Sequence, residues 1–162
     1  MKNVRNVAII AHVDHGKTTL VDKMLLAGHL FRENQNSGEL ILDNNDLERE
    51  RGITILSKNV SIRYKDYKIN LLDTSGQPDF LGDTLATMQA AEMAMFVVDA
   101  VDGPQVMTTR LWHEAETMRL CRCVFINHID REHANFDVAM ATLHARFGSR
   151  LGAVTIPMGV DK

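Results

Sequence analysis

Residues 11–19 read Ala11-His12-Val13-Asp14-His15-Gly16-Lys17-Thr18-Thr19, and the architecture of the chain can be argued from this stretch. The apolar residues 7–10 before it predict a buried strand, and the apolar positions of residues 20–26 after it predict a helix. A tight turn between a strand and a helix that opens on Gly-Lys-Thr presents backbone N–H groups and the positive end of the helix dipole to an anion. The stretch therefore predicts a phosphate-binding loop, although Ala11 stands where the usual pattern has glycine.

The residue types of this loop predict separate roles in holding a nucleotide. The Lys17 ammonium would reach the β- and γ-phosphates, and the Thr18 hydroxyl would ligand Mg²⁺. We expect Lys17 to be a charge that faces phosphate rather than a core residue, so that Lys17→Ala would abolish nucleotide binding and leave the fold intact. The predicted nucleotide contacts cover the whole loop: Ala11, His12, Val13, Asp14, His15, Gly16, Lys17, Thr18 and Thr19.

The composition is that of an ordinary globular domain. The 162 residues, 45% of them hydrophobic and 24% charged, are enough to bury the core of a single domain over residues 1–162. The net charge of −3 gives no overall basic field, so we expect no sequence-specific DNA partner. The chain enters its first strand without a signal segment and has no bilayer-length apolar run, so we expect a cytoplasmic monomer with no membrane contact. Cys121 and Cys123 predict free thiols on a strand.

The apolar pattern predicts an α/β fold. We expect strands over residues 4–11, 53–64, 68–73, 93–98, 123–126 and 154–157, and helices over 17–27, 79–91, 105–118 and 135–147. Residues 53–64 and 68–73 form an antiparallel hairpin, and strands alternate with helices thereafter. This order predicts a P-loop NTPase three-layer sandwich, in which a mostly parallel central sheet has one antiparallel edge hairpin and helices on both faces.

Polar motifs follow the carboxyl ends of the predicted strands, which is where ligands bind in such sheets. Asp73-Thr74-Ser75-Gly76-Gln77 follows one strand, and Asn127-His128-Ile129-Asp130 follows another. Residues 29–52 form a long polar connection that is usually functional or mobile, and we interpret it as a nucleotide-sensing switch.

The order of these motifs resembles that of the GTP-binding domain of translational GTPases. The phosphate loop comes first, followed by Arg51-Gly52-Ile53-Thr54-Ile55, then residues 73–77, then residues 127–130. Residues 1–73 are most similar to the ribosome-associated BipA/TypA GTPase, with a close match over residues 45–56. Residues 79–159 resemble elongation factor G and its paralogues through Leu111-Trp112-His113-Glu114, Asp130-Arg131-Glu132 and Ile156-Pro157-Met158-Gly159.

The resemblance implies GTP or GDP and Mg²⁺ as cofactors and the ribosome as a partner. It implies that Thr54 offers its hydroxyl to Mg²⁺, that Asp73 holds Mg²⁺ through water, and that the Gly76 N–H contacts the γ-phosphate. Asn127 and Asp130 would read guanine, with His128 between them. The implied catalytic residues are Gln77, Lys17 and Thr54, the implied metal ligands are Thr18, Thr54 and Asp73, and Val13 and Ile53 match an apolar gate beside the attacking water.

Three features depart from the family pattern. Ser75 and Gln77 stand where the family usually has proline and histidine, and Gln77 could orient water as it does in small GTPases. His128 replaces a lysine that ties the guanine loop to the phosphate loop, so we expect weaker nucleotide binding. The last guanine-contacting loop, a Ser-Ala element, has no recognisable counterpart, so the domain looks truncated before it.

These observations favour a GTP-binding domain of translation-factor type that hydrolyses GTP to GDP and phosphate, with weak activity in isolation. The alternative is a guanine-nucleotide-binding module, natural or engineered, with little or no turnover. An ATP-using kinase with the same phosphate loop and a non-binding structural relic also stay open.

Overall fold

The structure is a computed structural model that describes residues 3–28 and 54–158. The predicted switch over residues 29–52 and the gate residue Ile53 lie outside the described residues. The strands are β1 (Asn3–Ala11), β2 (Lys58–Tyr64), β3 (Tyr67–Asp73), β4 (Met93–Asp99) and β5 (Cys121–Asn127). The helices are α1 (Lys17–Ala27), the short 3₁₀ helix η1 (Pro78–Phe80), α3 (Leu81–Gln89), α4 (Val106–Thr117) and α5 (Phe136–Phe147).

Within the described residues the sheet has five strands in the order β2-β3-β1-β4-β5. Strand β1 pairs in parallel with β3 and β4, and β4 pairs in parallel with β5. Among the described strands only β2 and β3 pair antiparallel, and their hairpin forms one edge of this sheet. The predicted mostly parallel sheet with one antiparallel edge hairpin is confirmed.

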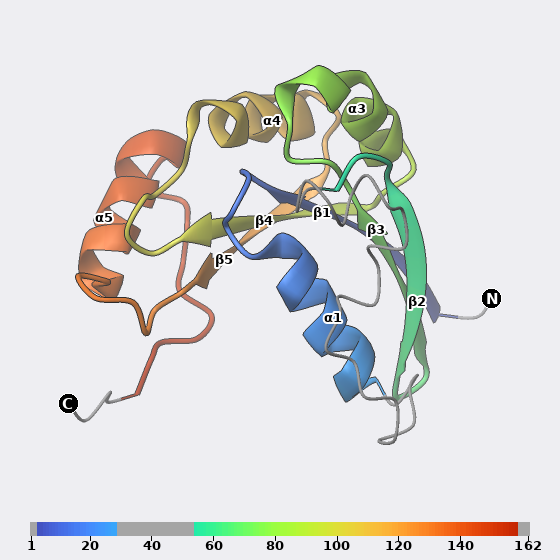
Figure 1. Cartoon of the computed structure of the whole chain (residues 1–162), viewed down its shortest axis with the longest axis horizontal. Coiled ribbons are helices and arrows are strands. Elements are labelled where there is room, and N and C mark those ends of the chain that lie inside the picture. The colour runs from blue at the N-terminus through green and yellow to red at the C-terminus, as the bar shows by residue number, and fades with distance from the viewer. Residues whose placement is uncertain (1–2, 29–53, 159–162) are drawn as a thin grey trace.

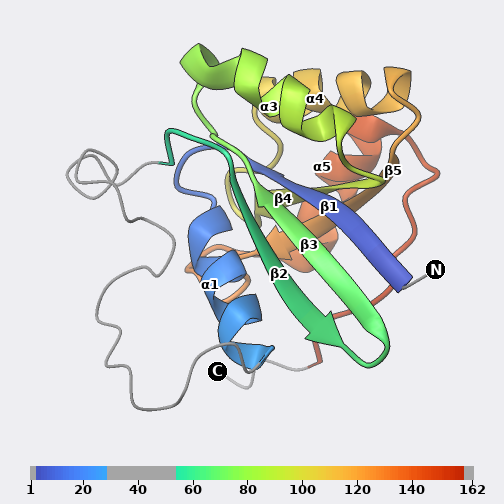
Figure 2. The same ribbon diagram turned by 90° about the vertical axis from the view of Figure 1, so that its right-hand side faces the viewer.

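The continuous apolar run of β1 serves two layers because successive side chains of a strand point to opposite faces. Val7 and Ile9 pack with α1, where Val21 and Leu25 are buried. On the opposite face, Ala8 and Ile10 pack with residues of α3 and α4 in a second cluster, which also contains Met88, Phe96, Leu111 and Trp112. Figure 1 and Figure 2 show α1 on one side of the sheet and α3 and α4 on the other, which confirms the three-layer arrangement.

Trp112 connects α5 to this core. Its ring lies 5.1 Å from that of Phe96 on β4 and stacks at 4.3 Å on Phe147, the last residue of α5. The predicted C-cap of α1 at Gly28 is also present, with its N–H donating to the carbonyl of Met24. No helix in the two described ranges is both long enough and apolar enough to cross a bilayer.

Two expectations about strands are wrong in part. Strand β2 begins at Lys58, and the described residues 54–57 before it are not strand. The apolar run 123–126 predicts a buried strand, but β5 lies at an edge of the described sheet, with Cys121 and Phe125 exposed. Both cysteines are free as predicted, and burial raises the pKa of the Cys123 thiol.

The predicted strand over residues 154–157 is absent from the described chain. Val154 is 97% exposed and Ile156 is 64% exposed. A cavity of about 440 Å³, lined by residues of β5, α5 and 150–157, lies along this segment. The apolar residue types suited a strand, but a strand also needs a partner ladder, and the sheet pairing of the described residues ends at β5.

Candidate functional site

The loop between β1 and α1 has the backbone that a phosphate cradle needs. Asp14 and Gly16 both adopt positive φ, 65° and 81°, so the chain turns sharply before Lys17 opens α1. The positive φ at position 16 favours glycine, and a Cβ there would lie 2.4 Å from Nδ2 of Asn127. The turn therefore brings the helix N-terminus against the loop that follows β5.

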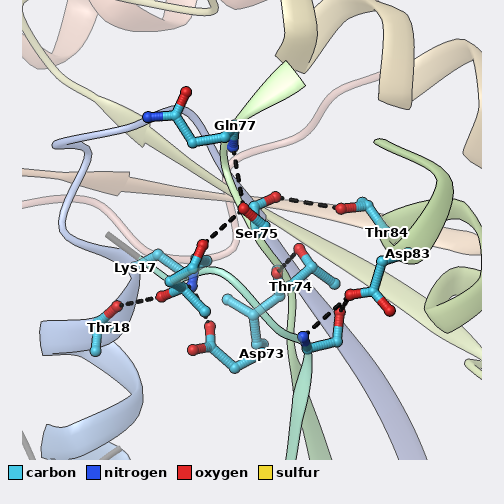
Figure 3. Close-up of polar contacts among 11 residues, drawn as sticks. Lys17, Thr18, Asp73, Thr74, Ser75, Gln77, Asp83 and Thr84 are labelled. Atoms are coloured by element: carbon cyan, nitrogen blue, oxygen red, sulfur yellow. Dashed lines mark hydrogen bonds and ion pairs between the residues drawn. The ribbon is translucent and has the colours of Figure 1, made fainter. Parts of the chain in front are cut away.

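Four predicted site residues converge at the start of α1. Lys17 Nζ forms an ion pair with Asp73 and donates to Oγ1 of Thr54 at 3.2 Å. The hydroxyls of Thr18 and Thr54 lie 3.2 Å apart. Figure 3 shows Lys17, Thr18 and Asp73 directed toward one another from α1 and the end of β3.

Lys17 is a buried residue, which corrects the expectation that it stands outside the core. Its side chain is 7% exposed, and Asp73, its partner, is fully buried. A buried ion pair is costly to break on one side only, because the remaining charge stays in a poorly solvated site. Substitution of Lys17 should therefore lower the stability of the fold as well as the affinity for any ligand at this site.

The same cluster fits Mg²⁺. Two threonine hydroxyls and one carboxylate are hard oxygen donors, and Mg²⁺ usually takes few protein ligands together with phosphate oxygens and water. The described residues hold no group of three or more histidine, cysteine or acidic side chains that could hold a metal by itself. A cation at Thr18, Thr54 and Asp73 would thus need further oxygens from a bound phosphate ester.

The loop after β3 packs directly on the phosphate loop. The Thr74 hydroxyl donates to the carbonyl of Ile9 at 2.8 Å, and a Cβ on Gly76 would lie 2.8 Å from the carbonyl oxygen of Ala11. Only glycine allows this approach, which places Gly76 beside Val13 as well. The side chain of Gln77, in contrast, extends away from Lys17 and Asp73 in Figure 3.

The loop after β5 is fastened to the phosphate loop by Asn127, and His128 lies beside Gly16. Asn127 Nδ2 donates to the carbonyl of His15 at 2.9 Å, and His128 Nε2 lies 3.0 Å from the Cβ position of Gly16. His128, at φ 56°, places its Nδ1 2.7 Å from Oδ2 of Asp99. Asp130 is exposed at the end of this loop.

Asp99 was not predicted and is the centre of this loop's network. Its fully buried carboxylate contacts His128 and accepts from Arg131 at 2.6 Å. Burial acts to raise the pKa of Asp99, but hydrogen bonds from His128, the backbone and Arg131 outweigh it and hold the pKa well below its usual range. The signal was available, because Asp99 follows the apolar run 93–98 as Asp73 follows its own strand.

His15 contributes to the same network through its ring. Its buried Nδ1 accepts from the N–H of Asp99 at 3.3 Å, and the ring meets His12 edge-on at 5.4 Å. Burial lowers the pKa of His15. The remaining predicted loop residues differ in exposure: Asp14 and Thr19 are exposed, and Val13 and Thr18 are half-buried.

A phosphate loop, an oxygen-donor cluster and a tethered third loop at one end of a mostly parallel sheet define a P-loop nucleotide-binding domain. Residues 2–157 match the family described as "Elongation factor Tu GTP binding domain", and the chain belongs to that family. The predicted resemblance to translational GTPases is thereby confirmed.

Individual relatives agree. The chain is 48% identical over 136 residues to the "Large ribosomal subunit assembly factor BipA" of Buchnera aphidicola, which covers 84% of this chain and 22% of that protein. It is 52% identical over 132 residues to a "Putative elongation factor TypA-like SVR3, chloroplastic" of Arabidopsis thaliana, covering 82% and 20%. The chain thus spans about a fifth of the length of these relatives. Matches over 136 and 132 residues extend beyond residue 73, where the predicted similarity to BipA/TypA ended.

A solved structure shares the fold. The crystal structure of a protein from Thermus thermophilus superposes with a TM-score of 0.83 at 27% identity, covering 91% of this chain and 23% of that one.

Proposed function

We propose that this chain binds guanine nucleotide with Mg²⁺ and hydrolyses GTP to GDP and phosphate, as one domain of a cytoplasmic factor that works with the ribosome. The observation that carries the proposal is the convergence of Lys17, Thr18, Thr54 and Asp73 beside the glycine turn. The ribosome is proposed as a partner because one of the similar proteins is named a large ribosomal subunit assembly factor.

The residues divide the work of the reaction. Lys17 would place its charge on the β- and γ-phosphates, and Thr18, Thr54 and Asp73 would hold Mg²⁺, which supplies neutralising charge when bound. The Gly76 N–H would meet the γ-phosphate, since Gly76 packs on the phosphate loop. Such a site accelerates phosphoryl transfer by positioning and electrostatics, with water as the nucleophile.

Asp130 would select the base. An ionised carboxylate only accepts hydrogen bonds, and guanine offers two donors on one edge, whereas adenine presents an acceptor at N1. Hydrogen bonds to a charged group contribute roughly 1.5–3 kcal/mol, so Asp130 accounts for a preference on the order of 10²-fold for guanine. Asp130 is exposed, three residues beyond the tethered Asn127, and is therefore accessible to a base.

Calorimetric titration with GDP, GTP and ATP in the presence of Mg²⁺ tests this proposal. We expect both guanine nucleotides to bind and ATP to bind at least about 10²-fold more weakly. Asp130→Asn should weaken GDP and improve xanthosine diphosphate, whose exocyclic group at that edge is a carbonyl. Glu132→Gln, on an exposed side chain two residues away, is the matched control and should change neither. An unchanged ratio in Asp130→Asn would exclude Asp130 as the base reader.

Single-turnover release of phosphate separates hydrolysis from binding alone. Small GTPases turn over unaided at roughly 10⁻⁴ to 10⁻³ s⁻¹, and we expect a rate of this order that falls further in Gln77→Ala. The orientation of Gln77 away from Lys17 favours the second candidate, a guanine-nucleotide-binding module with little turnover. Release no faster than the uncatalysed background, with GDP binding intact, would establish that candidate instead.

A further inference from the structure

The hydroxyl of Ser75 both donates and accepts a hydrogen bond. The side chain is 2% exposed, and its Oγ donates to the carbonyl oxygen of Thr54 at 2.7 Å. The same Oγ accepts from the N–H of Gln77 at 3.3 Å. Proline, which the translational GTPases usually have here, has no hydroxyl and could make neither bond. The two bonds are therefore a feature of this chain's own residue.

The backbone that carries Ser75 is fixed from two directions. The preceding residue, Thr74, is bonded to Ile9 of β1, and the hydroxyl of Thr84 on α3 donates to the carbonyl of Ser75 at 3.2 Å. Figure 3 shows Ser75 between Thr84 on one side and Lys17 on the other. Because its backbone is held by β1 and α3, the hydroxyl reaches Thr54 from a rigid base.

A second contact fastens the same segment three residues further on. The N–H of Ser57 donates to Oδ2 of Asp83 on α3 at 3.0 Å, and its hydroxyl bonds the same oxygen. Residues 54–57 are thus joined at both ends to the unit formed by the loop after β3 and helix α3. The Thr54 hydroxyl meanwhile faces Lys17 Nζ and Thr18 Oγ1.

We propose that Ser75 is a positioning residue that holds Thr54 against the phosphate loop, so that the segment before β2 and the loop after β3 shift together. Through this bond Ser75 holds the Thr54 hydroxyl in place for Mg²⁺. That last step rests on the proposed function, whereas the bond itself and its effect on residues 54–57 do not.

Amide hydrogen exchange on the nucleotide-free chain tests the first step. A buried hydrogen bond of ordinary strength corresponds to roughly a tenfold change in an opening equilibrium. We therefore expect Ser75→Ala to lower the protection of residues 55–57 by roughly tenfold, with β1 unchanged. Ser61→Ala is the matched control, because Ser61 also donates a 2.7 Å hydrogen bond, to Asn70 in the β2–β3 hairpin. Parent-like protection of residues 55–57 in Ser75→Ala would overturn the proposal.

Ser75→Pro keeps the test open should the alanine variant fail to fold, because it restores the residue usual in the family. It removes the hydroxyl, and we expect the same loss of protection over residues 55–57. Protection equal to that of the parent in the proline variant would also overturn the proposal.

The second step has its own measurement, the Mg²⁺ concentration that gives half-maximal enhancement of GDP binding. We expect it to rise several-fold in Ser75→Ala, while GDP affinity without Mg²⁺ stays at the parent value. Equal loss of affinity with and without Mg²⁺ would mean that Ser75 does not act through Thr54. If the parent itself bound no nucleotide, the proposed function would fail, yet the exchange result would still decide whether Ser75 holds residues 54–57.

Discussion

Lys17 and Asp73 form a buried ion pair, and this pair changes what a lysine substitution tests. Lys17→Ala should abolish nucleotide binding and also lower the free energy of unfolding by about 3–5 kcal/mol, because it removes one partner of a buried ion pair. Urea unfolding of the nucleotide-free chain measures the second effect. Lys23→Ala, at an exposed position of the same helix, is the control. A variant as stable as the parent would show that the pair adds nothing to the fold.

His15 makes stability depend on pH. Burial lowers its pKa from 6.5, and its Nδ1 can accept from the Asp99 N–H only when it carries no proton. The unfolded chain therefore binds the proton more readily than the folded chain. The contribution of His15 to the free energy of unfolding is fully present above pH 6.5 and falls as the pH drops below that value.

Unfolding free energies at about pH 7.5 and about pH 5.5 measure this effect. We expect the value to be lower at the acid pH, and His15→Asn to reduce the difference, since the amide oxygen can accept the same bond without titrating. His113→Asn, at a 64% exposed site, should keep the parent's difference. An undiminished difference in His15→Asn would assign the pH dependence to other groups.

Sequence patterns located single functional residues better than their partners. Lys17 was predicted from the phosphate-loop motif and Thr54 and Asp73 from the family resemblance, and the structure brings the three together. Asp99 and its contact with His128 were missed, because that contact joins residues 29 positions apart and leaves no local pattern. The burial of Lys17 was missed for the same reason, since its partner is 56 residues away.

Among the strands, the apolar pattern was most informative for those that are covered on both faces of the sheet. In β1 the alternation of Ile9 and Ile10 between two clusters explains an apolar run without polar breaks. It did not predict that residues 154–157 remain irregular or that β5 is an edge, because apolar residue types do not reveal whether a partner strand is present. Pairing is a tertiary property that composition does not contain.

The N-terminus of α5 gives a test of one helix by itself. Asn135 caps it by accepting from the N–H of Val138 at 3.1 Å. Asn135→Ala should lower the free energy of unfolding by about 1 kcal/mol, as loss of an N-cap usually does. For a domain of this size that lowers Tm by about 2–4 °C. Thermal unfolding with Glu132→Gln as the control measures it, and an unchanged Tm would mean that the cap is not stabilising.

For the molecule as a whole, the candidate site joins parts that are distant in sequence. The phosphate loop, residues 54–57, the loop after β3 and the loop after β5 meet at one end of the sheet, fastened to one another by Ser75, Gly76 and Asn127. A ligand that contacts all four segments would bind only the folded chain, because unfolding separates them. Binding to the folded state alone raises stability by mass action, whatever the chemistry that follows.

This linkage gives the last prediction. At a free GDP concentration of about 100 times Kd with Mg²⁺, the folded chain gains about 2.7 kcal/mol. With a shift of about 2–4 °C per kcal/mol for a domain of this size, Tm should rise by roughly 5–11 °C. Scanning calorimetry with GDP, GTP and ATP at equal concentration measures the shift, and Lys17→Ala provides the chain that should show none. Equal shifts with GDP and ATP would show a phosphate site that does not read the base. No shift with any nucleotide would mean that the convergence of Lys17, Thr54 and Asp73 serves the fold alone.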